Sequence, residues 1–160
     1  MKKKSPLFLI GIAVALLIIA IDQWSKELIL GFPELTGYNA IEITSFFNIV
    51  LVMNRGVSFG MFSEHNQPLI LTAIAIIIIS ILLIWLWKNS SLAVALGIGS
   101  VIGGAIGNVI DRIRYEAVVD FLDFHIAGLH WPAFNVADSF VFIGVVVLCI
   151  YSMFFEKKTT

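Results

Sequence analysis

Residues 103–139 read GGAIGNVIDRIRYEAVVDFLDFHIAGLHWPAFNVADS, and this stretch joins two very apolar segments of the chain. It contains four aspartates, Asp111, Asp120, Asp123 and Asp138. Carboxylates at the edge of a bilayer are costly, and they usually have a function there. We therefore interpret this stretch as the part of the chain that carries the chemistry, with Asp120 and Asp138 as a candidate catalytic pair.

The composition indicates a membrane protein. Of the 160 residues, 59% are hydrophobic, whereas soluble domains have roughly 45–50%. Four segments approach the length of about 20 apolar residues that a spanning helix needs, namely residues 7–30, 69–87, 92–110 and 139–155. We expect an all-α integral membrane protein, a bundle of four transmembrane helices that forms one domain over residues 1–160. The net charge of −1 suggests no nucleic-acid partner.

The basic residues predict the orientation of the bundle. With the N-terminus inside, six of the ten basic residues are cytoplasmic, at positions 2–4, 88, 157 and 158. Both termini are then cytoplasmic, and two longer connections lie on the outer side. Residues 31–67 are rich in β-branched and aromatic residues, which favours short strands in a small extracytoplasmic β-sheet. Residues 113–137, which include Trp131, are expected to be an interfacial loop.

Two rows of residues follow one face of the third helix at a spacing of four. Gly99, Gly103 and Gly107 lead to Asp111, and the adjacent row is Ser100, Gly104, Asn108 and Arg112. Small residues let a neighbouring backbone approach closely, so the glycines predict a packing ridge. For Asp111 and Arg112, an ion pair, a helix cap and a substrate contact all remain open.

Other polar residues of the helices have a structural and a functional interpretation. Asp22 and Lys26 are four residues apart, which predicts a salt bridge between them. The alternative is that they contact other polar groups at the same depth in the membrane. Asn135 and Asp138 precede the fourth apolar run, and either could be its N-cap.

Asp120 and Asp138 are expected near the same depth on one side of the membrane. Asp120 is flanked by apolar residues in VVDF, so desolvation and a second carboxylate would both raise its pKa. Two carboxylates that share a proton can activate water and protonate a leaving amine. No HExxH motif occurs, and we interpret the three histidines as hydrogen-bonding residues rather than metal ligands.

Five motifs together resemble bacterial lipoprotein signal peptidase, or signal peptidase II, across nearly the whole chain. They are DQWSK (22–26), NRGVSFG (54–60), GGAIGNVIDR (103–112), VVDF (118–121) and FNVADS (134–139). The resemblance implies an aspartic endopeptidase of the bacterial inner membrane that is inhibited by globomycin. It would remove signal peptides from diacylglyceryl prolipoproteins by cleaving before the lipidated cysteine.

The resemblance also implies the roles of individual residues. Asp120 and Asp138 would be the catalytic dyad; substrate or inhibitor would bind at Asn54, Asn108, Arg112 and Asn135. Asp22, Lys26 and Asp111 would support the site. No metal or other cofactor is expected, the active site would lie near the outer face, and the partners would be prolipoproteins and membrane lipids, with the protein a monomer.

Two rival functions make different predictions. A small polytopic transporter or ion-binding protein would depend most on the helix carboxylates Asp22 or Asp111. A non-enzymatic lipoprotein-binding factor would tolerate Asp120→Asn, because an amide keeps the shape of the carboxylate.

Overall fold

Four long helices and a small antiparallel sheet make up the computed structural model, which describes residues 6–35, 39–56 and 67–155. The predicted bundle of four apolar helices is confirmed, because each helix is long and apolar enough to cross a membrane. The lysines at positions 2–4, 157 and 158, on which the predicted orientation rests, lie outside the described residues, as do residues 57–60 of the second motif. The helices are α1 (Pro6–Leu30), α2 (Gln67–Lys88), α3 (Leu92–Tyr115) and α4 (Val136–Phe154).

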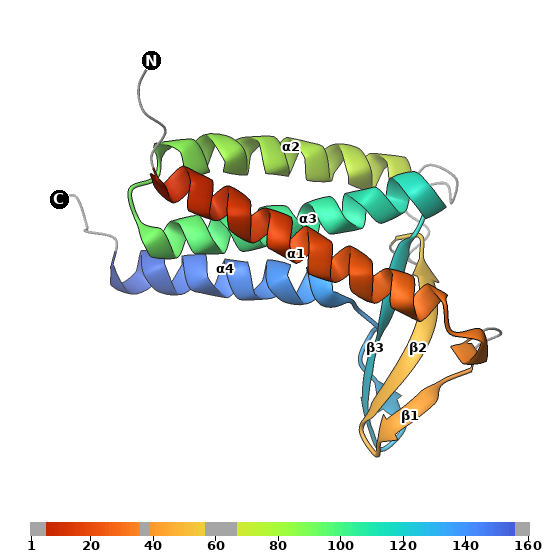
Figure 1. The fold of residues 1–160 in the computed structure, drawn as a ribbon. Helices are drawn as coiled ribbons and strands as arrows, with labels where there is room; N and C mark the ends of the chain where they lie inside the picture. Colours follow the sequence, from red (N-terminus) through yellow and green to blue (C-terminus); the bar gives the residue numbers. More distant parts are fainter. Residues whose placement is uncertain (1–5, 36–38, 57–66, 156–160) are drawn as a thin grey trace.

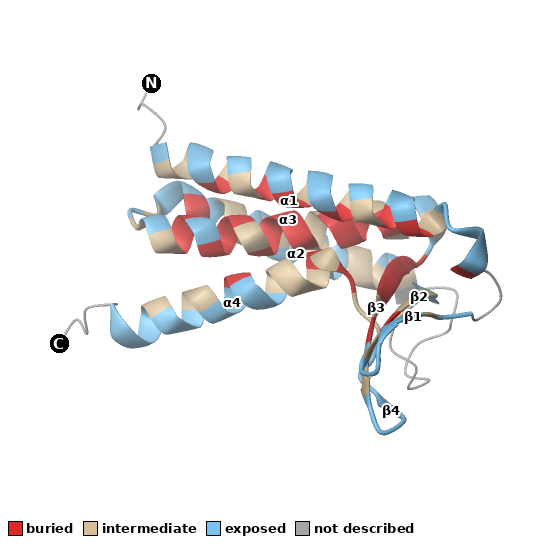
Figure 2. Ribbon diagram, turned by 60° about the horizontal axis from the view of Figure 1, so that its bottom comes forward, coloured by how far each residue is buried: buried red, intermediate tan, exposed pale blue. Residues whose placement is uncertain are grey.

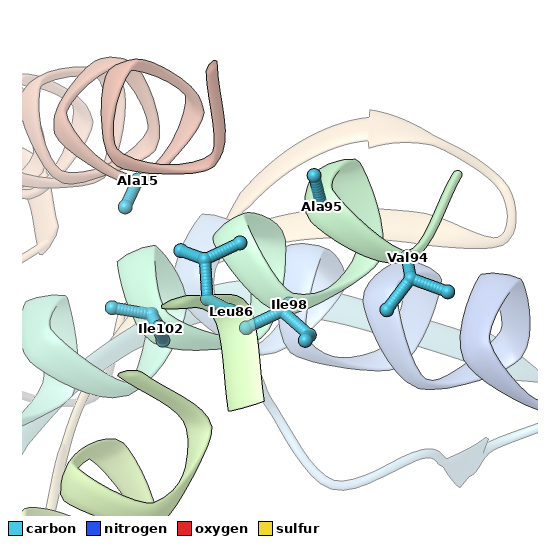
Figure 3. Packing of buried hydrophobic residues seen from close by; sticks show 6 residues of the cluster. All are labelled: Ala15, Leu86, Val94, Ala95, Ile98 and Ile102. Atoms are coloured by element: carbon cyan, nitrogen blue, oxygen red, sulfur yellow. The ribbon is translucent and has the colours of Figure 1, made fainter. Parts of the chain in front are cut away.

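Helix α3 is the centre of the bundle, because it packs against α1, α2 and α4. In Figure 2 most of its residues are buried, whereas α1 and α4 present exposed residues on their outer faces. Helices α1, α2 and α4 carry exposed large apolar side chains such as Leu16, Ile81 and Phe142, respectively, which suit contact with lipid. The core around the first half of α3 contains six buried residues (Figure 3): Ala15, Leu86, Val94, Ala95, Ile98 and Ile102.

The predicted glycine ridge is confirmed, and its two rows face different helices. A Cβ atom added at Gly99 would lie 2.5 Å from the carbonyl oxygen of Gly11, so this row brings α3 against the backbone of α1. A Cβ atom at Gly104 would collide with the carbonyl oxygen of Ala137 and lie 2.7 Å from Val141 Cγ2. Gly104 therefore permits the close approach of α4, the helix that carries Asp138.

Substitution of Gly104 by leucine is expected to lower the melting temperature of the protein in detergent. The added side chain must displace the α4 backbone, and overpacking of a tight interface costs about 1–3 kcal/mol or more. Gly31→Leu is the matched control, since a Cβ atom there would make ordinary contacts at 3.4 and 3.5 Å. Equal melting temperatures for Gly104→Leu and the wild type would contradict the packing role.

The sheet has the strand order β1-β2-β3-β4, and neighbouring strands are antiparallel. It projects from one end of the bundle, with its long strands running across the direction of the helices (Figure 1). Phe47 pairs with Phe124 at one end of the β2–β3 ladder, and Asn54 pairs with Val118 at the other. The strands are β1 (Ile41–Thr44), β2 (Phe47–Asn54), β3 (Val118–Ile126) and β4 (Leu129–His130).

The structure differs from the sequence interpretation in the connection between α3 and α4. Residues 113–137 were expected to be an interfacial loop, but they supply β3 and β4 as well as the last turn of α3. Helix α3 continues to Tyr115, beyond the predicted end at residue 110, and Glu116 caps it in the left-handed conformation (φ 54°). The small sheet is therefore built from both of the longer connections, the one between α1 and α2 and the one between α3 and α4.

Helix α4 begins three residues before the predicted start at residue 139, because Asn135 is its N-cap. The Asn135 side chain accepts a hydrogen bond from the backbone N–H of Asp138, and the Asp138 carboxylate accepts one from the backbone N–H of Asn135. Of the two predicted N-cap candidates, Asn135 is confirmed as the N-cap, whereas Asp138 lies at the third position of the helix and completes the capping box. The capping box also fixes the Asp138 side chain at the start of the helix.

Candidate active site

A buried lysine connects α1 and α3 at the end of the bundle near the sheet. Lys26 Nζ lies 2.8 Å from Asp22 Oδ2, which confirms the predicted pair, and 2.7 Å from Asp111 Oδ2. Both carboxylates and the lysine are buried, with exposed fractions of 0–2%. Asp111 thus pairs with Lys26 of another helix rather than with Arg112.

The two carboxylates that pair with Lys26 also hold the backbone beside the candidate dyad. Asp111 Oδ2 accepts a hydrogen bond of 3.1 Å from the N–H of Val119, the residue before Asp120. Asp22 Oδ1 accepts one of 2.9 Å from the N–H of Ala137, the residue before Asp138. The ion cluster of Asp22, Lys26 and Asp111 therefore holds the backbone of β3 and of α4 one residue before each candidate catalytic aspartate.

Two asparagines connect the side chains of Asp120 and Asp138. Asn135 Nδ2 donates to Asp120 Oδ1 at 2.7 Å, and Asn108 Nδ2 donates to Asp138 Oδ1 at 2.7 Å. The asparagines also bond to each other, because Asn135 Nδ2 lies 3.2 Å from Asn108 Oδ1. Lys26 Nζ donates to the same Asn108 oxygen at 3.1 Å, so one continuous network joins the ion cluster to both aspartates.

Asp120 lies in β3 with an exposed fraction of 2%. Its second carboxylate oxygen accepts a hydrogen bond of 2.9 Å from Asn54 Nδ2 on the neighbouring strand β2. Burial, with a further contribution from the charge of Asp138, raises the pKa of Asp120 to about 6, although the hydrogen bonds from Asn54 and Asn135 oppose the rise. A carboxyl group with a pKa in this range can exchange a proton near neutral pH.

Asp138 is only half-buried, and Arg112 lies nearby on α3. The Arg112 guanidinium interacts electrostatically with Asp138, Asp111 and Asp120. Within the described part of the chain, its Nη1 donates a long hydrogen bond of 3.4 Å to the carbonyl oxygen of Asn108. Arg112 therefore adds a cation beside the aspartates without being tied to any one of them.

All nine residues singled out from the sequence lie in or beside this network, although their chemical roles stay predictions. Gln23 was missed: its Nε2 lies 2.9 Å from Asp111 Oδ1 and 3.2 Å from Asp22 Oδ2, so it bridges the two acids. The available signal was its position in the DQWSK motif, as a polar residue within an apolar helix.

A second polar cluster lies further along the sheet, outside the network. His130 Nδ1 is 2.8 Å from Asp123 Oδ1, and Asn48 Nδ2 donates to Asp123 Oδ2 at 3.1 Å. His130 also stacks on His125, with a ring separation of 4.9 Å. The hydrogen bond of His130 agrees with the interpretation from the sequence, and no group of three potential metal ligands occurs in the described part of the chain.

The fold and this network define a polytopic membrane protein with two network-bound aspartates, Asp120 and Asp138, at one end of its helix bundle. Residues 14–154 match the family model for signal peptidase (SPase) II, so the chain belongs to the signal peptidase II family, and with it to the proteases. The family expected from the five sequence motifs is thereby confirmed.

Curated relatives and a solved structure agree with this family. The chain is 41% identical over 150 residues to a lipoprotein signal peptidase of Oleidesulfovibrio alaskensis, covering 91% of this chain and 95% of the relative. It is 42% identical over 144 residues to that of Burkholderia vietnamiensis, covering 86% and 83%. A solved bacterial membrane enzyme superposes with a TM-score of 0.83 at 31% identity, covering 98% of this chain and 99% of that one.

Proposed function

We propose that this protein is an aspartic endopeptidase that removes signal peptides from diacylglyceryl prolipoproteins, with Asp120 and Asp138 as its catalytic dyad. The substrate class follows from the relatives, which are named lipoprotein signal peptidases. The observation that carries the aspartic mechanism is the pair of bonded asparagines, Asn108 and Asn135, each of which holds one aspartate. Lys26 neutralises much of the charge of Asp22 and Asp111, which disfavours a cation-carrying role for those acids.

The proposed reaction begins with one proton shared by the dyad. Asp138 takes a proton from water while the water oxygen attacks the scissile carbonyl carbon, and Asp120 gives its proton to the carbonyl oxygen. Asp120 suits the acid role because burial raises its pKa to about 6. Asp138 suits the role of base because it is more accessible and donors from Asn108 and Asn135 orient its oxygens.

The tetrahedral intermediate then collapses. Asp120 regains a proton from a hydroxyl group of the intermediate as the carbon–nitrogen bond breaks, and Asp138 gives its proton to the leaving amine. The products are a signal peptide with a free carboxylate and a lipoprotein whose lipidated cysteine has a free amino group. Asn54 is exposed and bonded to Asp120, so it is placed to contact substrate as well as to orient the acid.

The location of the site suits a lipid-bearing substrate. The network lies at the end of the bundle from which the sheet projects (Figure 1), and a diacylglyceryl group can reach it by diffusion within the bilayer. We assign this end to the outer face of the bacterial inner membrane, with both termini cytoplasmic, and we expect the protein to act as a monomer over residues 1–160.

The direct test is cleavage of a purified diacylglyceryl prolipoprotein by the protein in detergent, with the product mass recorded. We expect cleavage immediately before the lipidated cysteine. The matched substrate has serine in place of that cysteine, cannot be lipidated, and should remain intact. A folded protein that leaves the lipidated substrate uncut would contradict the proposed function.

The pH dependence of kcat/KM is expected to be bell-shaped, with its alkaline limb near pH 6. The singly protonated dyad is the active form, and raising the pH through the pKa of Asp120, about 6, removes the shared proton. Asn54→Ala should move this limb to higher pH, because the Asn54 hydrogen bond lowers the pKa of Asp120. Rate measurements at subsaturating substrate report these pKa values for the free enzyme.

The neighbouring substitution Met53→Ala serves as the control for Asn54→Ala. Met53 is on the same strand and its side chain is exposed, but it faces the opposite side of the sheet. The pH profile of Met53→Ala should have its alkaline limb at the same pH as the wild type. A flat profile in the wild type would argue against a shared proton.

A further inference from the structure

A cavity lies at the end of the bundle opposite the sheet. It has a volume of about 640 Å³ and is formed by the last turn of α2, the connection to α3, the first turn of α3 and the last turns of α4. In Figure 1 this end is the one where α1 begins and α4 ends. It is remote from the Asp120–Asp138 network, so the proposed peptidase reaction does not account for it.

The cavity carries an isolated positive charge. Lys88 lines it, and among the described residues Lys88 has no ion-pair partner. The sequence contains no Asp or Glu over residues 6–21, 67–110 and 139–155, so no described carboxylate of this half can neutralise that lysine. Residues 1–5 and 156–160, which the structure does not describe, contain five lysines and one glutamate. Electrostatics therefore favours an anionic occupant.

The lining is polar beside Lys88 and apolar deeper along the helices. Asn89, Ser91 and Tyr151 provide the polar part, while Val94 and Leu148 provide an apolar wall. The Asn89 side chain holds the connection in place, since its Oδ1 accepts from Ser91 N at 2.9 Å and its Nδ2 donates to Ser91 O at 2.6 Å. The polar rim is thus built on a fixed backbone.

A pocket that is cationic at its rim and apolar below, at the end of a transmembrane bundle, matches an amphiphile with an anionic head. Basic pockets between helices near a membrane surface are typical binding sites for anionic lipid headgroups. Trp85 also lines the cavity, and tryptophan favours the depth at which lipid headgroups meet acyl chains.

We propose that this cavity binds an anionic phospholipid of the leaflet on the side of the two termini. The phosphate lies beside Lys88, the glycerol region meets the hydroxyl and amide groups of the rim, and an acyl chain lies against Val94 and Leu148. The site goes beyond the proposed peptidase function and does not depend on it.

Lipid binding to the full-length protein, delipidated in detergent, tests the site by native mass spectrometry. The probes are phosphatidylglycerol and phosphatidylcholine with identical acyl chains. We expect the wild type to prefer phosphatidylglycerol, and Lys88→Gln to bind it roughly fivefold more weakly, the effect of one lysine near a charged lipid. Lys88→Arg should retain the preference, because it keeps the cation.

Arg114→Gln is the charge-matched control, because Arg114 pairs with Glu27 near the opposite end of the bundle. It should bind phosphatidylglycerol as the wild type does. An equal loss in Arg114→Gln and Lys88→Gln, or no preference in the wild type, would overturn the proposal. Displacement of the lipid by an equal concentration of inorganic phosphate would also overturn it, because a simple anion site would then explain the binding.

Discussion

Replacing either Asp120 or Asp138 by asparagine is expected to lower kcat for prolipoprotein cleavage by on the order of 10⁴-fold or more, as happens when one member of a catalytic set is lost. The amide keeps the shape of the side chain and most of its hydrogen bonds. At position 138 it can neither accept a proton from water nor return one to the leaving amine, and at position 120 it has no acidic proton to give to the carbonyl oxygen. Because Asn135 and Asn54 donate to Asp120, its asparagine replacement can rotate to present its oxygen to only one of them at a time. The measurement is single-turnover cleavage in detergent.

The control for these variants is Asp123→Asn. Asp123 is on the same strand, but it pairs with His130 and Asn48 rather than with the asparagine network. It should retain most of the activity, and all three variants should bind the lipidated substrate. Cleavage at the wild-type rate by Asp120→Asn would contradict the dyad and would move catalysis to other residues of the chain.

The sequence predicts the four helices well because spanning helices depend on local composition alone. The pair Asp22–Lys26 was predictable for a similar reason, since residues four apart share one helix face. Strand β3 was not predicted: Val118, Val119, Asp120 and Phe121 are all buried, so the segment shows no alternation of apolar and polar residues. It forms a strand because β2 pairs with it and Phe134 accepts two of its N–H groups on the other side.

The partners within the candidate site required the tertiary structure. Asp111 could have paired with Arg112 or capped a helix, and only the packing of α3 against α1 brings it 2.7 Å from Lys26. The close approach depends on Gly107, where an added Cβ would collide with the Asp22 carboxylate. Gly107 thus makes room for the ion cluster of Asp22, Lys26 and Asp111. Spacing in the sequence identified the glycine and the charged residues, but it did not show that they are in contact.

Lys26→Met is expected to destabilise the folded protein by about 3–5 kcal/mol, because it leaves two buried carboxylates without their cation. Lys26 is 2% exposed and contacts Asp22, Asp111 and Asn108. Reversible unfolding in mixed detergent micelles measures the free energy. The substitution Arg114→Met is the matched control: the Arg114–Glu27 pair also joins α3 to α1, but its side chains are 46% and 52% exposed. Exposed pairs contribute about 0–1 kcal/mol, so the control should remain near the wild type.

The activity of Lys26→Met separates a role of Lys26 in positioning the dyad from a purely structural role. Asp22 and Asp111 hold the N–H groups of Ala137 and Val119, so repulsion between the unpaired acids should displace the starts of α4 and β3. At a temperature where Lys26→Met is still folded, kcat should fall while KM for the lipidated substrate changes little. The charge of Lys26 also lowers the pKa of Asp120, so the alkaline limb of the pH profile should move to higher pH. Loss of stability with an unchanged kcat and pH profile would restrict Lys26 to holding the helices together.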